Sequence, residues 1–219
     1  MKRKLVLYLI LLLFVAGGGS IGYYYWYQGA HYVATEDARI AGEIYRVMPK
    51  MTGKLTDLTI KEGDTVIADQ VVGQQDSANL ATNMLENSLL RAPISGTVIK
   101  TEAKVGEVVS TGQTVALIID ESNLYISANL EETEIGRVQV GQKVDIYLDA
   151  YPDKTLSGHL MEIGQATNST FSLMPATNTS GNFTKVTQRI PVKIAIDDSA
   201  GLSLSAGLNA EIKVHVKES

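Results

Sequence analysis

The side chains that most often carry chemistry are few in this chain and widely separated. There is no cysteine, which excludes disulfides, thiolate zinc sites, a cysteine nucleophile and an acylated lipoprotein cysteine. The three histidines, His31, His159 and His215, have no ligand-like neighbour at metal-binding spacing. The acidic run EETE, residues 131–134, is typical of the first turn of a helix. Phosphate-binding glycine loops, nucleophile elbows and paired catalytic carboxylates are missing too, so the sequence predicts neither an enzyme nor a metal site.

Two lysines, Lys61 and Lys104, occupy matching places in an internal repeat. Residues 47–68 (VMPKMTGKLTDLTIKEGDTVIA) and 91–110 (RAPISGTVIKTEAKVGEVVS) superpose with a single offset of 43 positions. Each copy reads Gly, x, aliphatic, five residues, Lys, x, Gly, acidic, x, Val. A glycine at each end is expected to turn the backbone with positive φ, and these glycines are Gly53, Gly63, Gly96 and Gly106. Two such copies predict a small two-fold β-sandwich.

This repeat resembles the lipoyl-like, or barrel-sandwich hybrid, domain. Residues 89–98, LLRAPISGTV, resemble its second half in bacterial membrane fusion proteins, the HlyD-type export adaptors. The resemblance implies two alternatives: carrier enzymes hold a lipoyl or biotinyl lysine in the turn between the halves, whereas export adaptors insert a long α-helical hairpin there. The connector at residues 73–90, GQQDSANLATNMLENSLL, contains no lysine, which argues against a carrier. We therefore expect no cofactor, and interpret Lys61 and Lys104 as solvated hairpin residues.

The connector is also short for an export adaptor. Its 18 residues, folded as a hairpin, would give arms of roughly eight residues and about 12 Å of reach. Asp76 or Ser77 could begin a helix of two or three turns. Two apolar pairs have the i,i+4 spacing of such a helix: Leu80 with Met84, and Leu85 with Leu89. By the resemblance, a full hairpin reaches an outer-membrane channel, so a vestigial one implies no such channel and a single-membrane, Gram-positive type of cell.

The N-terminal 30 residues have the pattern of a membrane anchor. Three cations, Lys2, Arg3 and Lys4, precede an uncharged run from Leu5 to Trp26, which is about 33 Å long as a helix. A cleaved signal peptide is the alternative, because the segment also has a basic start and small residues at 16–20.

An aromatic cluster favours retention of this segment. The run YYYWY at residues 23–27 is typical of a membrane–water interface, and its members include Tyr23, Tyr25 and Trp26. The cations then place the N-terminus in the cytoplasm and the bulk of the chain outside a plasma membrane that it crosses once.

The C-terminal half alternates apolar and polar residues with a period of two, as half-buried strands do. The four series are Leu124/Ile126/Ala128/Leu130, Val144/Ile146/Leu148, Ile190/Val192/Ile194/Ile196 and Ile212/Val214/Val216. A fifth strand is expected at 155–164, and one or two helical turns within 131–142. This pattern predicts an antiparallel sheet closed into a barrel or sandwich.

The same half resembles the β-barrel of the EmrA-type subgroup of membrane fusion proteins. The resemblance rests on residues 129–160 and 171–197, and residues 35–44, TEDARIAGEI, resemble the subgroup's incoming strand. It implies partnership with a major-facilitator drug–proton antiporter.

A long polar segment at 165–188 interrupts this half. It contains the apolar residues Phe171, Leu173, Met174 and Phe183. They either fold back on the barrel or form a protruding hairpin that contacts a neighbouring subunit or the transporter.

The expected organisation is mainly β. An anchor at 1–30 is followed by a linker and incoming strand at 31–44, a lipoyl-like domain at 45–120 and a small antiparallel β-barrel at 121–219. Beyond the three N-terminal cations the chain has 16 basic and 24 acidic residues, which disfavours nucleic acid as a partner.

The expected function is that of a membrane-anchored, homo-oligomeric adaptor in multidrug or toxic-compound efflux. The transporter partner would supply the energy. The alternatives are an adaptor for an ABC-type peptide or bacteriocin exporter, and a stand-alone envelope-binding module without an export role.

Overall fold

The computed structural model describes residues 2–78, 81–167, 187–199 and 201–216, with side chains from Leu12 onward except those of 82–84. The chain forms two compact units. One comprises residues 1–39, 126–202 and 208–219, and the other comprises 40–125 and 203–207.

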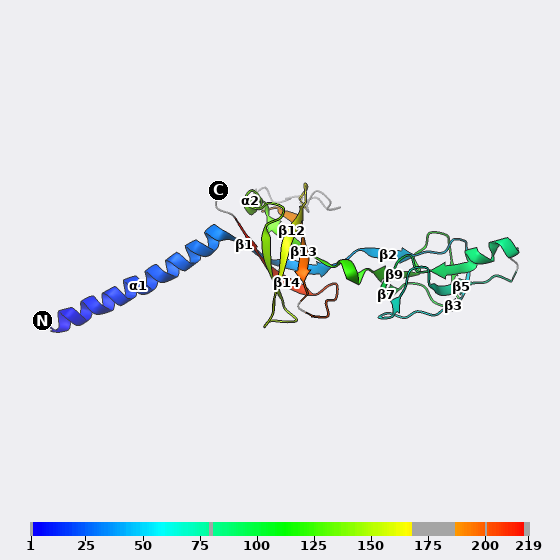
Figure 1. The fold of residues 1–219 in the computed structure, drawn as a ribbon, viewed down its shortest axis with the longest axis horizontal. Helices are drawn as coiled ribbons and strands as arrows, with labels where there is room; N and C mark the ends of the chain where they lie inside the picture. Colours follow the sequence, from blue (N-terminus) through cyan, green and yellow to red (C-terminus); the bar gives the residue numbers. More distant parts are fainter. Residues whose placement is uncertain (1, 79–80, 168–186, 200, 217–219) are drawn as a thin grey trace, which may run out of the picture. The chain divides into compact units, whose positions relative to one another are not determined.

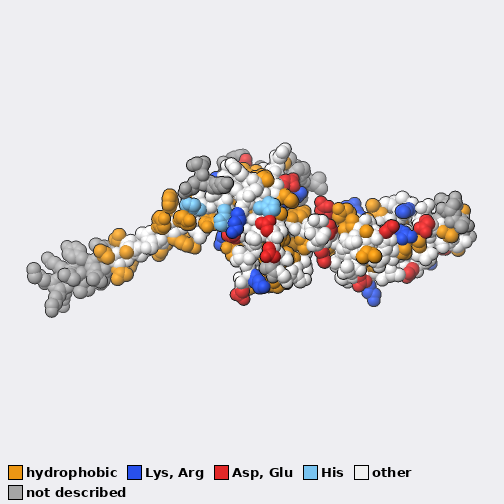
Figure 2. Space-filling model, in the orientation of Figure 1, with side chains coloured by type: hydrophobic (Ala, Val, Ile, Leu, Met, Phe, Trp, Pro, Cys, Tyr) orange, Lys and Arg blue, Asp and Glu red, His pale blue; other side chains and the backbone are white. Residues whose placement is uncertain are grey.

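The first unit begins with helix α1, Lys2–His31, which continues directly into strand β1, Tyr32–Ala41 (Figure 1). Apolar side chains of α1 such as Leu12 and Phe14 are exposed, and Figure 2 shows hydrophobic side chains along the described part of the helix. Tyr23, Tyr25 and Trp26 are exposed as well. Among the described residues, no helix combines the length and the hydropathy that a membrane span requires.

Six strands of this unit close into a barrel in the order β1-β10-β13-β12-β11-β14. Their bounds, after β1, are β10 Tyr125–Glu131, β11 Lys143–Leu148, β12 Thr155–Ile163, β13 Arg189–Asp198 and β14 Asn209–His215, with a one-turn helix α2 at Glu132–Ile135. Residues at every second position, including Ile126, Ile146, Ile194 and Ile212, are fully buried inside it. The alternation in the sequence therefore predicted the barrel strands correctly, because each strand has one buried face.

The second unit is a sandwich of two four-stranded sheets, ordered β2-β9-β7-β4 and β6-β5-β3-β8. The bounds are β2 Ile44–Val47, β3 Gly53–Leu58, β4 Thr65–Val66, β5 Val71–Gln75, β6 Leu89–Arg91, β7 Gly96–Thr101, β8 Val108–Val109 and β9 Ala116–Ile119. The offset of 43 maps β3 onto β7 and β4 onto β8. Each sheet contains strands from both copies of the repeat, so the copies interlock around one core.

The backbone hydrogen bonds obey the same offset. Gly63 N–H donates to Val98 O at 2.8 Å, and Gly106 N–H, 43 positions later, donates to Leu55 O at 2.7 Å. The acidic residue of each turn accepts a hydrogen bond from the backbone N–H of the lysine three positions earlier, as in Lys61 to Asp64 Oδ2 at 2.8 Å. The equivalent bond from Lys104 to Glu107 Oε2 is 3.1 Å long. The two-fold sandwich predicted from the sequence is confirmed.

The four repeat glycines divide into two kinds. Gly63 and Gly106 have φ of 91° and 97°, as expected of turn glycines. Gly53 and Gly96 do not have positive φ, so the prediction that they form turns was wrong: each begins a strand. At Gly96 the reason for glycine is space, because a Cβ there would lie 2.1 Å from Ile119 O.

Alanine at Gly63 or at Gly106 should lower the free energy of unfolding by about 1 kcal/mol, the cost of a left-handed backbone for a residue with a Cβ. Neither position has an atom within 4 Å of the added Cβ, so no clash contributes. Chemical denaturation measures this cost. Gly136, which is equally open but has a right-handed φ of −64°, provides the control. Equal costs for Gly63→Ala and Gly136→Ala would contradict the explanation.

The connector contains a seven-residue 3₁₀ helix, η1, at Thr82–Ser88 instead of the expected α-helical turns. Asp76 does not cap it: its Oδ1 accepts a hydrogen bond from Ala78 N–H at 3.0 Å, and η1 begins later. Leu89 already belongs to β6, where it pairs with Gln74. Leu85 and Leu89 therefore do not share a helix, and strand pairing overrides their spacing.

Candidate functional site at the end of the N-terminal helix

The C-terminal end of α1 is bonded to the barrel by residues distant in the sequence. Arg137 Nη2 donates to the carbonyl oxygens of Gly29 and Ala30, at 2.6 and 2.9 Å. Arg137 Nη1 donates to Glu134 Oε2 at 2.5 Å, and Glu134 lies in α2. The helix end thus rests against the segment that follows β10.

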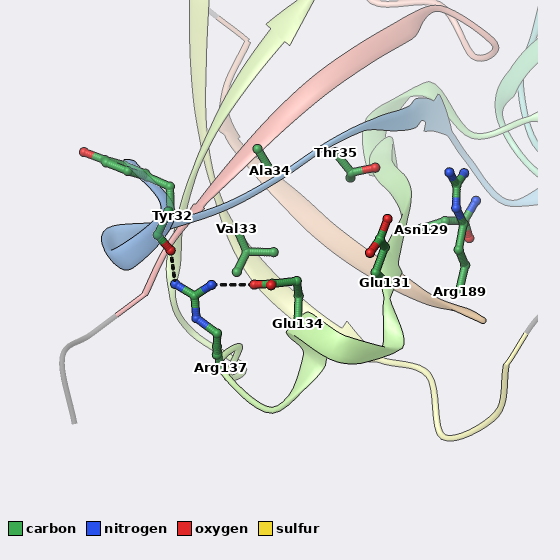
Figure 3. Close-up of a pocket in the computed structure, with 10 residues that line it drawn as sticks. Tyr32, Val33, Ala34, Thr35, Asn129, Glu131, Glu134, Arg137 and Arg189 are labelled. Carbon is green, nitrogen blue, oxygen red and sulfur yellow. Dashed lines mark hydrogen bonds and ion pairs between the residues drawn. The ribbon is translucent and has the colours of Figure 1, made fainter. Parts of the chain in front are cut away.

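A polar cavity of about 320 Å³ lies at this place (Figure 3). Several polar side chains line it, from β1, β10, α2, the turn after α2 and the start of β13: Thr35, Asn129, Glu131, Glu134, Arg137 and Arg189. Arg189 forms an ion pair with Asp37 of β1. Both arginines of the cavity are therefore engaged with carboxylates, and the arrangement is suited to holding elements together.

Each histidine has a partner of another residue type in the structure. His159 Nδ1 lies 2.6 Å from Asp197 Oδ1, and His215 Nε2 lies 2.6 Å from Asp145 Oδ2. The ring of His31 stacks on Tyr27 within α1. Over the residues that the structure describes, no group of three or more histidine, aspartate, glutamate or cysteine side chains could hold a metal ion.

Within the described part of the chain, two charged residues have clearly shifted pKa values, and in each case the main cause is a hydrogen bond with a side chain close by in the sequence. The side chains of Ser122 and Asn123 donate hydrogen bonds to Asp120 and lower its pKa. On β14, the hydrogen bond with Glu211 raises the pKa of Lys213, whose ammonium also lies 4.9 Å from the centre of the Tyr147 ring. Neither group lines the cavity beside Arg137.

The contact and anchor residues proposed from the sequence do not line this cavity, and several lie outside the residues that the structure describes. Phe171, Leu173, Met174 and Phe183 fall within 168–186, and the side chains of Lys2, Arg3 and Lys4 are not among those described. The junction residue Arg137 was missed. No local pattern could have found it, because its hydrogen bonds to the carbonyls join residues 107 and 108 positions apart.

Comparison with known proteins supports one family throughout. Residues 43–121 match the model for the barrel-sandwich hybrid domain of RND membrane fusion proteins, and residues 123–215 match the AAEA-like β-barrel domain. The putative efflux system component YhbJ of Bacillus subtilis is 40% identical over 187 residues, which cover 85% of this chain and 81% of that protein. The chain belongs to the EmrA-type membrane fusion proteins.

This membrane fusion protein is shorter than several of its relatives. It is 43% identical to the colistin resistance protein EmrA of Acinetobacter baumannii over 126 residues, 58% of this chain but 36% of that one. The multidrug export protein EmrA of Haemophilus influenzae is 33% identical over 153 residues, 68% of this chain and 39% of that protein. The chain thus spans well under half of these EmrA proteins.

Solved structures agree on the fold of this membrane fusion protein. The periplasmic adaptor protein EmrA matches with a TM-score of 0.57 and 14% identity, over 85% of this chain and 99% of that one. The membrane fusion protein Spr0693 of Streptococcus pneumoniae R6 matches with a TM-score of 0.62 and 17% identity, with the same coverage of both chains. Its curated relatives are named as an efflux system component and as a multidrug export protein.

Proposed function

We propose that this chain is the membrane-anchored adaptor of a multidrug efflux system in a cell with a single membrane. The observation that carries the proposal is the connector of the sandwich. Between β5 and β6 the chain has 13 residues, 76–88, whose described helix is the 3₁₀ helix η1. A segment of this length cannot reach across a periplasm, since 13 residues fully extended span at most about 45 Å, and half that as a hairpin.

The exposed apolar side chains of α1 support an anchor. Leu12, Phe14 and Trp26 are 70%, 80% and 65% exposed, and such surface is unfavourable in water. The sequence N-terminal to Leu12 is also apolar, from Leu5 on. A helix that is apolar on all sides belongs in a protein core or a membrane. We infer that the bilayer covers α1, with Lys2, Arg3 and Lys4 on the cytoplasmic side and the two β units outside.

The partner in this proposal is a major-facilitator antiporter, and the adaptor works as a homo-oligomer. The resemblance to the EmrA-type subgroup implies this partner, and the relatives named as multidrug export proteins support a role in drug export. The adaptor would then act by binding and positioning, while the transporter supplies energy from its ion gradient.

Purification of the tagged protein in a mild detergent tests the partnership. A major-facilitator transporter should co-purify, and deletion of the gene should raise the accumulation of hydrophobic cations and uncouplers in cells. Re-expression of the wild-type gene should restore the original level. An ATP-driven exporter in the eluate would favour the peptide-export alternative. Unchanged accumulation, with the transporter still present, would argue against any role in efflux.

A further inference from the structure

The junction between α1 and the barrel contains a contact that family membership does not explain. We propose that Arg137 is a positioning residue: with Glu134 it clamps the C-terminal end of α1 to the barrel, so that the anchor and the barrel move together. The contact between Arg137 and the helix end does not depend on the proposed function. The effect of this contact on export rests on the proposed function.

The end of a helix provides the chemical reason for this contact. The last carbonyl groups of an α-helix have no partner within the helix, and together they carry a partial negative charge. The Arg137 guanidinium supplies a positive charge and bonds two of these carbonyls, those of Gly29 and Ala30. A third carbonyl, that of His31, accepts a hydrogen bond from Val216 N–H at 2.9 Å. Residues of the barrel unit therefore satisfy three successive carbonyls of the helix end.

Glu134 holds the guanidinium in place. Its Oε2 accepts a hydrogen bond from Nη1, as Figure 3 shows, while Nη2 donates to the carbonyl oxygens of Gly29 and Ala30. Both terminal nitrogens of the guanidinium are therefore used. A lysine carries the same charge, but its three donors share one nitrogen, whereas the arginine reaches the carboxylate and the carbonyls from two separate nitrogens. The contact thus depends on arginine specifically.

The junction has no linker that could absorb motion. Helix α1 ends at His31 and β1 begins at Tyr32. Tyr32 pairs with His215 of β14 in the sheet. Their rings lie edge to face, with 4.9 Å between the ring centres. A displacement of the helix end must therefore move β1 or break the bonds to Arg137.

Hydrogen exchange of the full-length protein in detergent tests the clamp. The Arg137→Gln variant should exchange the amides of the last turn of α1 about fivefold faster, as expected when a helix-end interaction is lost. Arg189→Gln is the matched control, because Arg189 lines the same cavity but pairs with Asp37 of β1 and not with the end of α1. Exchange within β11 and β12 should be unchanged in both variants.

Two further variants separate charge from geometry. Arg137→Lys should restore only part of the protection, and Glu134→Gln, which keeps an accepting oxygen, should lose less than Arg137→Gln. Equal exchange in the Arg137→Gln and Arg189→Gln proteins would overturn the clamp. Full protection in Arg137→Lys would overturn the role of the arginine fork.

Drug accumulation measures the consequence. At equal abundance in the membrane, Arg137→Gln should raise accumulation relative to Arg189→Gln. Faster amide exchange at the end of α1 without any change in drug accumulation would show that the clamp does not affect export. If deletion of the whole gene has no effect, the proposed function fails, while the exchange data still decide whether the clamp exists.

Discussion

Alanine in place of Gly96 is expected to lower the free energy of unfolding of the sandwich by about 3 kcal/mol, and its melting temperature by roughly 15 °C. The added Cβ would lie 2.1 Å from Ile119 O and 3.0 Å from Ile119 C, so the backbones of β7 and β9 must separate. Those strands form the centre of their sheet, and their displacement disturbs the core around Val98 and Ile118.

Gly53 is the matched control, because the repeat places it 43 positions before Gly96. There the nearest atom to an added Cβ is Gln75 Nε2 at 3.4 Å, an ordinary contact with a side chain. Gly53→Ala should therefore cost less than about 0.5 kcal/mol. Calorimetry can follow the transition of the sandwich beside that of the barrel. Similar melting temperatures for the two variants would refute the close approach at Gly96.

Arginine at both Leu12 and Phe14 is expected to release most of the protein from the membrane. Each arginine near the centre of a spanning helix costs about 2.5–3.5 kcal/mol on insertion scales, and both side chains are exposed on α1. Carbonate extraction followed by immunoblotting measures the fraction retained. The wild type should stay with the membrane pellet, and cells with the double variant should accumulate drug like the deletion strain.

The control is alanine at the same two positions, which shortens the side chains without adding charge. That variant should remain in the pellet, because alanine is accepted within a membrane helix. Wild-type protein in the supernatant would show that α1 is not an anchor, and would leave the fold and the family unaffected.

The sandwich could be predicted from the sequence because the features that specify it are short-range and occur twice. Turn glycines, an acid that bonds the turn and alternating core residues occur twice at one offset, and each is a short-range constraint. The barrel followed from alternation for the same reason. Gly96 was assigned to a turn because sequence does not distinguish a glycine needed for φ from one needed for space.

The contacts at the candidate site could not be predicted in this way. Arg137 follows a short acidic helix and reads as a surface residue, and only the closed barrel brings it to Gly29 and Ala30. Gln75 is a similar case: it is fully buried at a position whose equivalent at the offset of 43 is Ile118, and its Nε2 donates to Met51 O at 3.0 Å. Such residues depend on tertiary contacts that no spacing rule describes.

The strands on either side of the connector are already neighbours: β5 and β6 pair with each other, with Gln74 opposite Leu89. Whatever lies between them closes a hairpin whose ends the sheet holds together. Doubling the length of a flexible loop costs only about 0.6 kcal/mol, so the sandwich is nearly indifferent to what is inserted there. The reach of such an adaptor can therefore be lengthened or shortened at this one point without redesign of the domain that carries it.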